Sequence, residues 1–317
     1  MCWLCRTGIC RPIGCRVRGR DLSLRVLRMA AGATFQDLGR PGFRRFGVPL
    51  GGAFDQESHR LALALVGAAD GPTLEIPIPG AEFEAVADDR MAVVGAVVPI
   101  VLDGTSLLSQ SSFRVHPGQR LSIGPADQGL RVYLASARGW RVKRRLESAS
   151  GVVPDSELAS GLELPTREGL VRLAAPPSSL DRGPVRLLPG PQATIDDLQA
   201  LSHGVFQVGL NSNRVGIRLQ GGDFAPRGEL TSEPSVFGAV QLAPSGELLV
   251  HGPDGPTIGG YPKVAVVAMA DLDRLGQLRP GMEVRFEMID PHRAQELRTA
   301  REERLATTFR DLKLSLA

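Results

Sequence analysis

The sequence has 317 residues, a formal net charge of +3 and 43% hydrophobic residues, enough apolar material for one large or two medium-sized folded units. Its basic residues are spread along the chain, which excludes an electrostatic footprint for nucleic acid, and no run of 18 apolar residues predicts a membrane span. The 37 glycines and 24 prolines fall between short apolar runs, a pattern typical of many turns joining many strands.

The first 21 residues differ from the rest of the chain. They contain all four cysteines, Cys2, Cys5, Cys10 and Cys15, and no periodic apolar pattern. Zinc binding is one interpretation, but the cysteine spacing lacks the long loop that separates paired ligands in zinc modules. We therefore predict a disordered extension over 1–21 and no metal site. Because the remaining residues contain no cysteine, as in proteins kept reduced, we infer a cytoplasmic protein with no membrane partner.

Deletion of residues 1–21 is expected to leave the melting temperature and partner binding unchanged, because an unstructured extension adds no packing to the folded state. A thermal melt and a pull-down of the truncated chain test this. Stoichiometric zinc in the purified full-length protein would contradict it.

From residue 22 to about 180, short strand patterns alternate with turn signals. Runs at 23–28, 90–94, 97–102, 120–123 and 130–134 are bounded by Gly, Pro or Asp. One helix interrupts them, because Asp55 is a suitable N-cap, leucines follow at 61, 63 and 65, and Gly67 marks its end. The segment 22–180 is therefore predicted as a β-rich first lobe.

A Pro/Ser-rich stretch between 172 and 190 breaks this rhythm and places a lobe boundary near residue 180. Further strand patterns follow at 185–188, 205–208, 216–219, 247–250, 264–267 and 283–286. Short helices with acidic first turns are expected at 195–201 and 271–275. We predict a second β-rich lobe over 181–290 and a helical tail over 291–317.

Two polar segments are candidates for chemistry, and each has a structural alternative. The glycine-rich stretch from Thr34 places Asp37 and Arg40 beside exposed amides, where they contact a substrate or only satisfy turn backbone. The turn at Ser212 and Asn213 precedes Arg214, whose guanidinium suits a carboxylate or phosphate. Its alternative is a plain turn with asparagine in a left-handed conformation.

Glu233 and Gln241 form a third candidate pair, as a general base with an orienting amide or as an ordinary hairpin end. Lys263 is one of three lysines against 34 arginines, and it follows a Gly-Gly-Tyr-Pro turn. A compact ammonium binds carbonate, phosphate or carboxylate oxygen, although a solvated surface lysine is the default interpretation. No P-loop, dinucleotide fingerprint, G-x-S-x-G elbow or H-E-x-x-H motif occurs, so any enzyme activity requires another chain.

Several motifs resemble, in order, those of the family of 5-oxoprolinase C subunits, also called allophanate hydrolase subunit 2 or KipA-like, the biotin-dependent carboxyltransferase domain, subdomains A and B. They are T-F-Q-D-L-G-R-P-G-F from Thr34, G-V-P-L-G-G-A-F-D from Gly47, T-L-E-I from Thr73, L-P-G-P-Q from Leu188, S-N-R-V-G-I-R-L from Ser212, G-A-V-Q from Gly238 and T-I-G-G-Y-P-K from Thr257. The resemblance implies a mainly β fold of cyclophilin-like β-barrel architecture.

The resemblance also implies a function. It predicts one component of an ATP-dependent 5-oxoprolinase, which opens 5-oxoproline to L-glutamate together with a KipI-like B subunit and an A subunit. ATP would be shared with the complex, and biotin is not expected on this chain. Two alternatives stay open: a carboxyltransferase or allophanate hydrolase-type component acting on urea-like amides, and a non-catalytic regulator that sequesters a KipI-like partner.

Together with the resemblance, these motifs predict catalytic roles for Lys263, Asp37 and Glu233. Substrate contacts are expected from the motif residues Gln36, Arg40, Ser212, Asn213, Arg214, Gln241, Asp254, Thr257, Gly259, Gly260 and Tyr261. Three positions depart from the family pattern: Pro256 and Ile258 replace a glutamine and a threonine, and Ala149 replaces an arginine. Each change removes a polar group near the expected pocket, which bears on the substrate and on activity.

Overall fold

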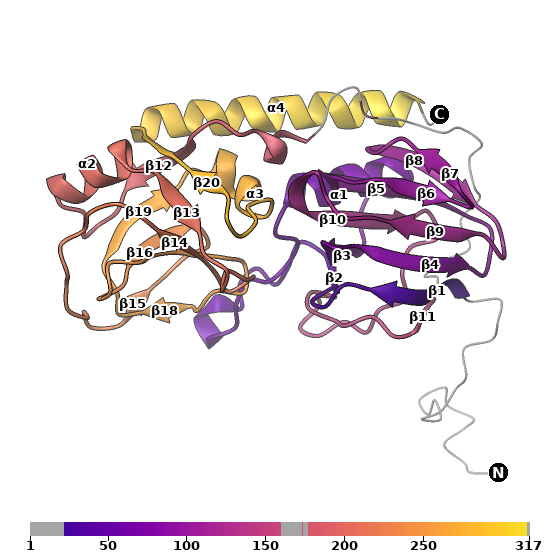
Figure 1. Cartoon of the computed structure of the whole chain (residues 1–317), viewed down its shortest axis with the longest axis horizontal. Coiled ribbons are helices and arrows are strands. Elements are labelled where there is room, and N and C mark those ends of the chain that lie inside the picture. The colour runs from indigo at the N-terminus through magenta and orange to yellow at the C-terminus, as the bar shows by residue number, and fades with distance from the viewer. Residues whose placement is uncertain (1–21, 160–172, 174–176, 316–317) are drawn as a thin grey trace, which may run out of the picture.

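The computed structural model describes residues 22–159, 173 and 177–315 and divides into two β-rich halves that lie side by side under one long helix (Figure 1). The predicted extension over 1–21, with its four cysteines, lies outside the described residues. Among those described, no helix combines the length and apolar character that a membrane crossing requires. The prediction of a mainly β fold is confirmed.

The N-terminal half, 22–159, consists of two facing sheets. One has the order β11-β1-β4-β9-β6-β7 and the other β2-β3-β10-β5-β8. Their strands are β1 (Leu22–Met29), β2 (Thr34–Gln36), β3 (Thr73–Pro77), β4 (Ala81–Ala85), β5 (Asp89–Val97), β6 (Ile100–Leu102), β7 (Thr105–Leu107), β8 (Ser111–Val115), β9 (Arg120–Ile123), β10 (Gln128–Ser136) and β11 (Glu157–Ala159).

The central strand β5 is buried along almost its whole length because both of its faces are covered. Met91 and Val93 pack into the core between the two sheets, whereas Ala92 and Val94 pack against the helix α1 on the other side. Successive side chains of a strand point to opposite faces, so alternate residues join different cores. A continuous apolar run therefore replaces the alternating pattern of a half-exposed strand.

The helix α1 (Gln56–Leu65) begins and ends as its local sequence predicts. Asp55 accepts a hydrogen bond from the backbone of Ser58 at 2.9 Å, which satisfies a free amide of the first turn. Gly67 has a φ of 79°, the left-handed conformation that ends many helices. Leu61 and Leu65 are buried against β5 and β10, so the helix covers the outer face of that sheet.

The C-terminal half, 185–288, is built on one eight-stranded sheet in the order β20-β13-β14-β17-β16-β19-β12-β21. Its two outermost strands, β20 (Glu283–Val284) and β21 (Phe286–Met288), are separated by the single residue Arg285. A sheet whose edges meet in this way curls into a nearly closed barrel, which leaves little free edge. The barrel-like architecture expected from the family resemblance is thus confirmed.

The remaining elements of this half are β12 (Val185–Pro189), β13 (Phe206–Val208), β14 (Gly216–Gln220), β15 (Glu233–Pro234), β16 (Ala239–Leu242), β17 (Leu248–His251), β18 (Ile258–Gly259), β19 (Lys263–Val267), α2 (Ile195–His203) and α3 (Leu272–Leu275). Short 3-10 turns are η3 (Arg44–Phe46), η4 (Ser178–Leu180) and η5 (Met269–Asp271). The barrel interior is filled by leucine, valine and phenylalanine side chains, among them Leu187, Phe206, Val240, Leu248, Val250 and Val264.

The long helix α4 (Pro291–Ser315) runs across both halves (Figure 1). Arg301 forms an ion pair with Asp273 of the C-terminal half, and Arg304 donates to Glu57 of α1 at 2.9 Å. Leu305 and Leu312 are its two buried residues. The surface helix expected after Pro291 is therefore present, and it joins the two halves through ion pairs more than through apolar packing.

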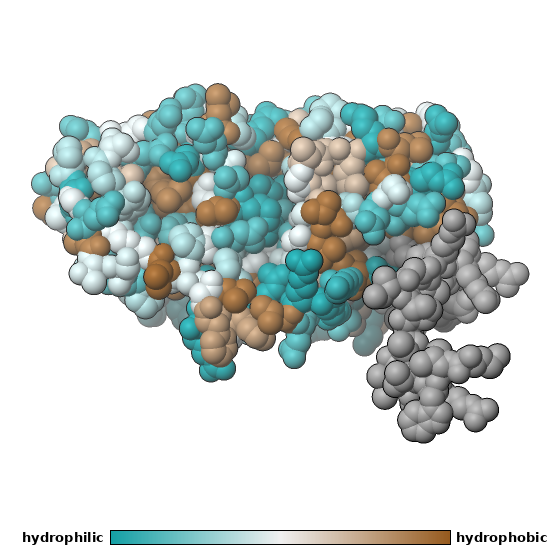
Figure 2. Space-filling view, turned by 90° about the horizontal axis from the view of Figure 1, so that it is seen from below, coloured by the Kyte–Doolittle hydropathy of each residue, from teal (hydrophilic) through white to brown (hydrophobic). Residues whose placement is uncertain are grey.

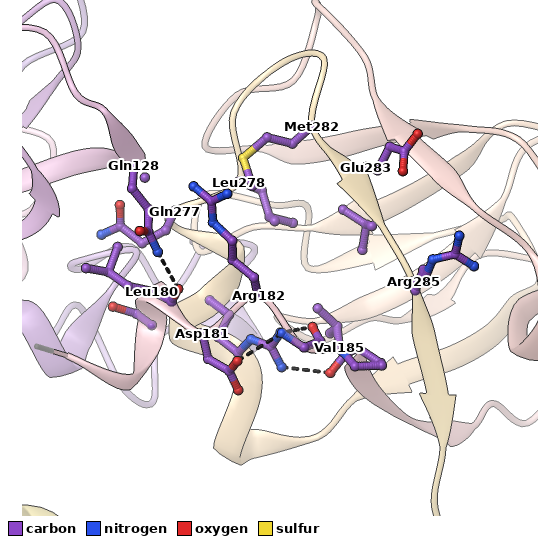
Figure 3. A pocket seen from close by; sticks show the side chains of 16 residues that line it. Gln128, Leu180, Asp181, Arg182, Val185, Gln277, Leu278, Met282, Glu283 and Arg285 are labelled. Carbon is purple, nitrogen blue, oxygen red and sulfur yellow. Dashed lines mark hydrogen bonds between the residues drawn. The ribbon is translucent and has the colours of Figure 1, made fainter.

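A cavity of about 380 Å³ separates the halves near Gln277 (Figure 3). The Gln277 side chain donates to Asp55 at 2.7 Å and accepts from the backbone of Leu130 at 2.9 Å. Gln128 donates across the junction to the carbonyl oxygen of Leu180 at 2.7 Å. The amide groups around the cavity are thus committed to holding the halves together.

Candidate active site

Lys263 begins β19, directly after the Gly-Gly-Tyr-Pro turn that follows β18. Its side chain is only 7% exposed, and its ammonium forms an ion pair with the carboxylate of Glu233. The interpretation of Lys263 as a solvated surface lysine is therefore wrong. Strands β12 and β16 pair with β19 on either side, and the turn delivers the side chain to a carboxylate instead of to water.

Glu233 lies on β15, where it pairs with Gly259 of β18. Its side chain is 39% exposed, so one face of the ion pair meets solvent. Gln192 donates from its side chain to Glu233 at 2.7 Å and accepts from the backbone amide of Lys263 at 2.9 Å. The hydrogen bond from Lys263, reinforced by Gln192, lowers the pKa of Glu233 and keeps the carboxylate ionised at neutral pH.

A chain of hydrogen bonds lies behind this pair. Gln241 of β16 is the register partner of Lys263. His251 accepts or donates at both ring nitrogens, contacting the side-chain oxygen of Gln241 at 2.8 Å and the hydroxyl of Ser235 at 2.9 Å. All three side chains behind the ion pair are at least 97% buried. We call these six residues the Lys263 cluster: Gln192, Glu233, Ser235, Gln241, His251 and Lys263.

Burial of His251, with Arg44 and Lys263 nearby, lowers its pKa from 6.5 to about 4. The folded chain therefore keeps a neutral imidazole where the unfolded chain takes up a proton, so stability falls as the pH drops from 6.5 to 4. The loss attributable to this residue is about 3 kcal/mol at pH 4.

Urea denaturation between pH 7 and pH 4 tests this expectation. A His251→Gln variant is expected to lose less stability over this range than the parent does. His292→Gln is the matched control, because the side chain of His292 is 87% exposed. Equal pH dependence of the parent and His251→Gln would contradict a neutral buried imidazole.

Gln192 and His251 were not predicted as site residues from the sequence. Gln192 ends the L-P-G-P-Q motif, which was a usable signal, whereas His251 lies in an ordinary strand pattern and gave none. Arg44, from the 3-10 turn η3 of the N-terminal half, donates to the carbonyl oxygen of Ser235 at 2.5 Å. The N-terminal half thus reaches the edge of the Lys263 cluster.

Arg214 belongs to a second, separate group at the junction of the halves. Its guanidinium donates to Glu75 at 2.6 Å, to Asp254 at 2.8 Å and to the carbonyl oxygen of Gly52 at 2.6 Å. Although burial opposes the charge, Glu75 and Asp254 raise the pKa of Arg214. Every direction of the fork is therefore occupied by protein.

Glu75 is the centre of this group and is 1% exposed. Besides Arg214, it accepts from the hydroxyl of Tyr133 at 2.8 Å and the backbone of Phe54 at 3.0 Å, and Arg131 lies 3.3 Å away. Burial alone would raise the pKa of Glu75, but the two guanidinium groups outweigh it and hold the pKa below its ordinary value. The group is a buried electrostatic joint between the halves.

Asp37 and Arg40 form a third group, around residues 145–150. Asp37 accepts from the hydroxyl of Ser148 at 2.6 Å and the backbone of Ala149 at 2.7 Å. Arg40 donates to the carbonyl oxygens of Arg145 and Ser150. Both side chains thus satisfy loop backbone, the alternative that the sequence left open.

Gln36 belongs to the same third group. It is fully buried, and its side-chain oxygen accepts from the hydroxyl of Ser150 at 2.6 Å. Ser150 in turn accepts from the backbone of Gly52 at 2.6 Å. Gln36 therefore anchors the loop that Asp37 and Arg40 hold.

Ser212 and Asn213 shape the turn before Arg214. Asn213 accepts from the backbone amides of Val215 and Gly216 at 2.8 and 3.3 Å, and Ser212 accepts from that of Arg218 at 3.0 Å. The expected left-handed asparagine is wrong, because the side chain of Asn213 satisfies the turn amides without that conformation. These two residues position Arg214.

The other predicted contacts surround the Lys263 cluster. A Cβ atom on Gly259 would lie 2.9 Å from the side-chain nitrogen of Gln241, and one on Gly260 would lie 2.8 Å from the carbonyl oxygen of Leu230. Only glycine fits at either place. Tyr261 offers its carbonyl oxygen to Gln241 at 3.4 Å, and Thr257 accepts from the backbone of Ser235.

The structure therefore brings together Lys263, Glu233 and Gln241 and keeps Asp37 and Arg214 in other groups. The pocket expected to join Lys263, Arg214 and Asp37 is replaced by three groups whose printed contacts do not overlap. Over the part of the chain that the structure describes, no three His, Cys, Asp or Glu side chains are grouped to hold a metal ion. The Lys263 cluster is the group with a buried ammonium beside a partly exposed carboxylate, the arrangement suited to an anionic ligand.

This barrel with a lysine at a strand entrance is characteristic of carboxyltransferase-type proteins. The family described as "Carboxyltransferase domain, subdomain A and B" matches residues 46–288, and the chain belongs to it. The resemblance inferred from the motifs is thus confirmed.

Relatives of known structure or function agree. The 5-oxoprolinase C subunit of Haemophilus influenzae is 31% identical over 293 residues, 87% of this chain and 94% of that protein. The crystal structure of TTHA0988 has a TM-score of 0.78 and 35% identity, covering 84% of this chain and 56% of that one. The K. lactis urea amidolyase structure has a TM-score of 0.79 and 26% identity, covering 91% of this chain but only 20% of that one.

Proposed function

We propose that this chain is the C subunit of an ATP-dependent 5-oxoprolinase that converts 5-oxoproline to L-glutamate with a KipI-like B subunit and an A subunit. The carrying observation is the Lys263–Glu233 ion pair, buried on one side and open to solvent on the other. The similarity to the Haemophilus influenzae 5-oxoprolinase C subunit over 94% of that protein supports this choice.

The chemistry fits such a site. Opening a stable lactam requires activation of its carbonyl oxygen, which ATP provides by phosphoryl transfer, and the transition state carries negative charge on oxygen. The ammonium of Lys263 would stabilise that charge, and the carboxamide of Gln241 would orient the amide. Glu233 holds the ammonium in place before the substrate arrives and, once displaced, is available as a general base.

A companion protein also has a surface to bind. Phe46, Val236 and Ile258 are 67%, 50% and 59% exposed, and all lie on segments next to the Lys263 cluster. On the face seen in Figure 2, hydrophobic residues form small groups separated by hydrophilic ones, with several near the middle of the molecule. Small apolar groups of this kind suit a non-obligate protein interface. The departure to Ile258 adds to this surface.

A second candidate is a carboxyltransferase component acting on a urea-like amide, supported by the family match and the urea amidolyase fold. Carboxyl transfer also passes through an anion that Lys263 would hold. A biotin carrier would then be a separate chain.

Co-expression with the companion B and A subunits, followed by an ATP-dependent glutamate release assay, tests the proposal. We expect glutamate formation that requires all three chains. Urea-dependent carboxyl transfer from carboxybiotin would favour the second candidate instead. Tight binding to the KipI-like partner with neither activity would indicate the non-catalytic regulator.

A further inference from the structure

A second cavity, of about 820 Å³, lies on the N-terminal half between α1, the C-terminal part of α4 and the segment 137–147. We call it the α1–α4 pocket. No residue of the Lys263 cluster lines it. Its volume falls within the range of small-molecule sites, so it can accommodate a ligand independent of the proposed reaction.

One wall of the α1–α4 pocket is apolar. Leu63, Ala64 and Val66 contribute it from α1, and Phe309 faces them from α4. Leu63 and Val66 are already at least 95% buried, and Ala64 and Phe309 are partly exposed. This wall offers a hydrocarbon or aromatic group a place to leave water.

A buried imidazole supplies a polar anchor. His59 lines the pocket and is 1% exposed. Its Nδ1 lies 2.8 Å from the hydroxyl of Thr73, while its Nε2 has no hydrogen-bond partner among the described residues. Burial lowers its pKa to about 4, so the ring is neutral at pH 7. With Nδ1 accepting from Thr73, Nε2 carries the proton and donates to a ligand acceptor.

The charges at the mouth favour an anion. Arg60 and Lys313 are exposed there and form no ion pair within the described part of the chain. Asp37, which also lines the pocket, already accepts from Gly39, Ser148 and Ala149. The available cations therefore outnumber the available acceptors close to His59.

From this geometry we propose that the α1–α4 pocket binds a small carboxylate with an apolar tail. The carboxylate accepts from His59 Nε2 and is attracted by Arg60 and Lys313. The tail packs along Leu63, Ala64 and Phe309.

Octanoate is the probe, titrated into the full chain by calorimetry and followed by thermal shift. We expect saturable binding and a rise in melting temperature, and no binding of octylamine, which has the same tail and the opposite charge. Lys313→Glu is expected to weaken octanoate binding about fivefold. Arg310→Glu is the matched control, since Arg310 is exposed on the same helix and does not line the pocket.

Ala64→Phe fills the apolar wall and is expected to abolish binding while the chain still melts cooperatively. The proposal is overturned if octanoate shows no saturable binding, if octylamine binds equally well, or if Lys313→Glu and Arg310→Glu have the same effect. Because Lys313 lies on the surface, its variant tests the proposal even if Ala64→Phe fails to fold.

Discussion

Replacing Lys263 with methionine is expected to lower turnover of the reconstituted complex at least about a hundredfold, because one charge-assisted contact to a developing anion is worth roughly 2.7–4 kcal/mol of barrier. Methionine fills nearly the same buried space, and the abandoned Glu233 is partly exposed and can be hydrated. The folded chain should therefore persist with a modest loss of stability. Steady-state kinetics of the complex, with urea denaturation of the isolated chain, separate the two effects.

Two further variants sharpen the test of Lys263. Lys263→Arg is expected to restore little activity, since a planar fork does not reproduce a compact ammonium. Lys143→Met is the matched control, because Lys143 is exposed and belongs to none of the three polar groups. Full turnover by Lys263→Met in a demonstrably active complex would make the residue structural.

The largest expected loss of stability comes from Glu75→Gln. Removing one partner from a buried, hydrogen-bonded ion pair costs about 3–5 kcal/mol, and Glu75 serves two guanidinium groups, Arg131 and Arg214. A neutral amide also places an NH₂ group among donors from Tyr133 and Phe54. Urea denaturation should move to a clearly lower midpoint without a change of slope.

An exposed ion pair of the same type provides the comparison. Glu82→Gln breaks the pair with Arg28, whose side chains are 42% and 55% exposed, and should cost under about 1 kcal/mol. Similar losses for the two glutamine variants would mean that the Glu75 group is not an electrostatic joint. A double variant with Arg214→Met would then show no coupling to Glu75.

The sequence by itself determined the features that depend on neighbours a few residues apart. The turn-rich apolar runs predicted strands, and Asp55, Ser58 and Gly67 predicted both ends of α1, because capping bonds join residues within one turn. The motifs around Thr34 and Thr257 predicted the family. Lys263 stood out because lysine is rare in this chain.

Only the tertiary structure decided which polar residues meet. Glu233 and Gln192 reach Lys263 across separations of 30 and 71 positions, and Glu75 reaches Arg214 across 139. Such pairs depend on strand order and register in a nearly closed sheet, and a shift of one residue would turn each side chain to the opposite face. Local sequence carries no signal for that register, which is why Arg214 and Asp37 were expected beside Lys263 and instead lie in separate groups.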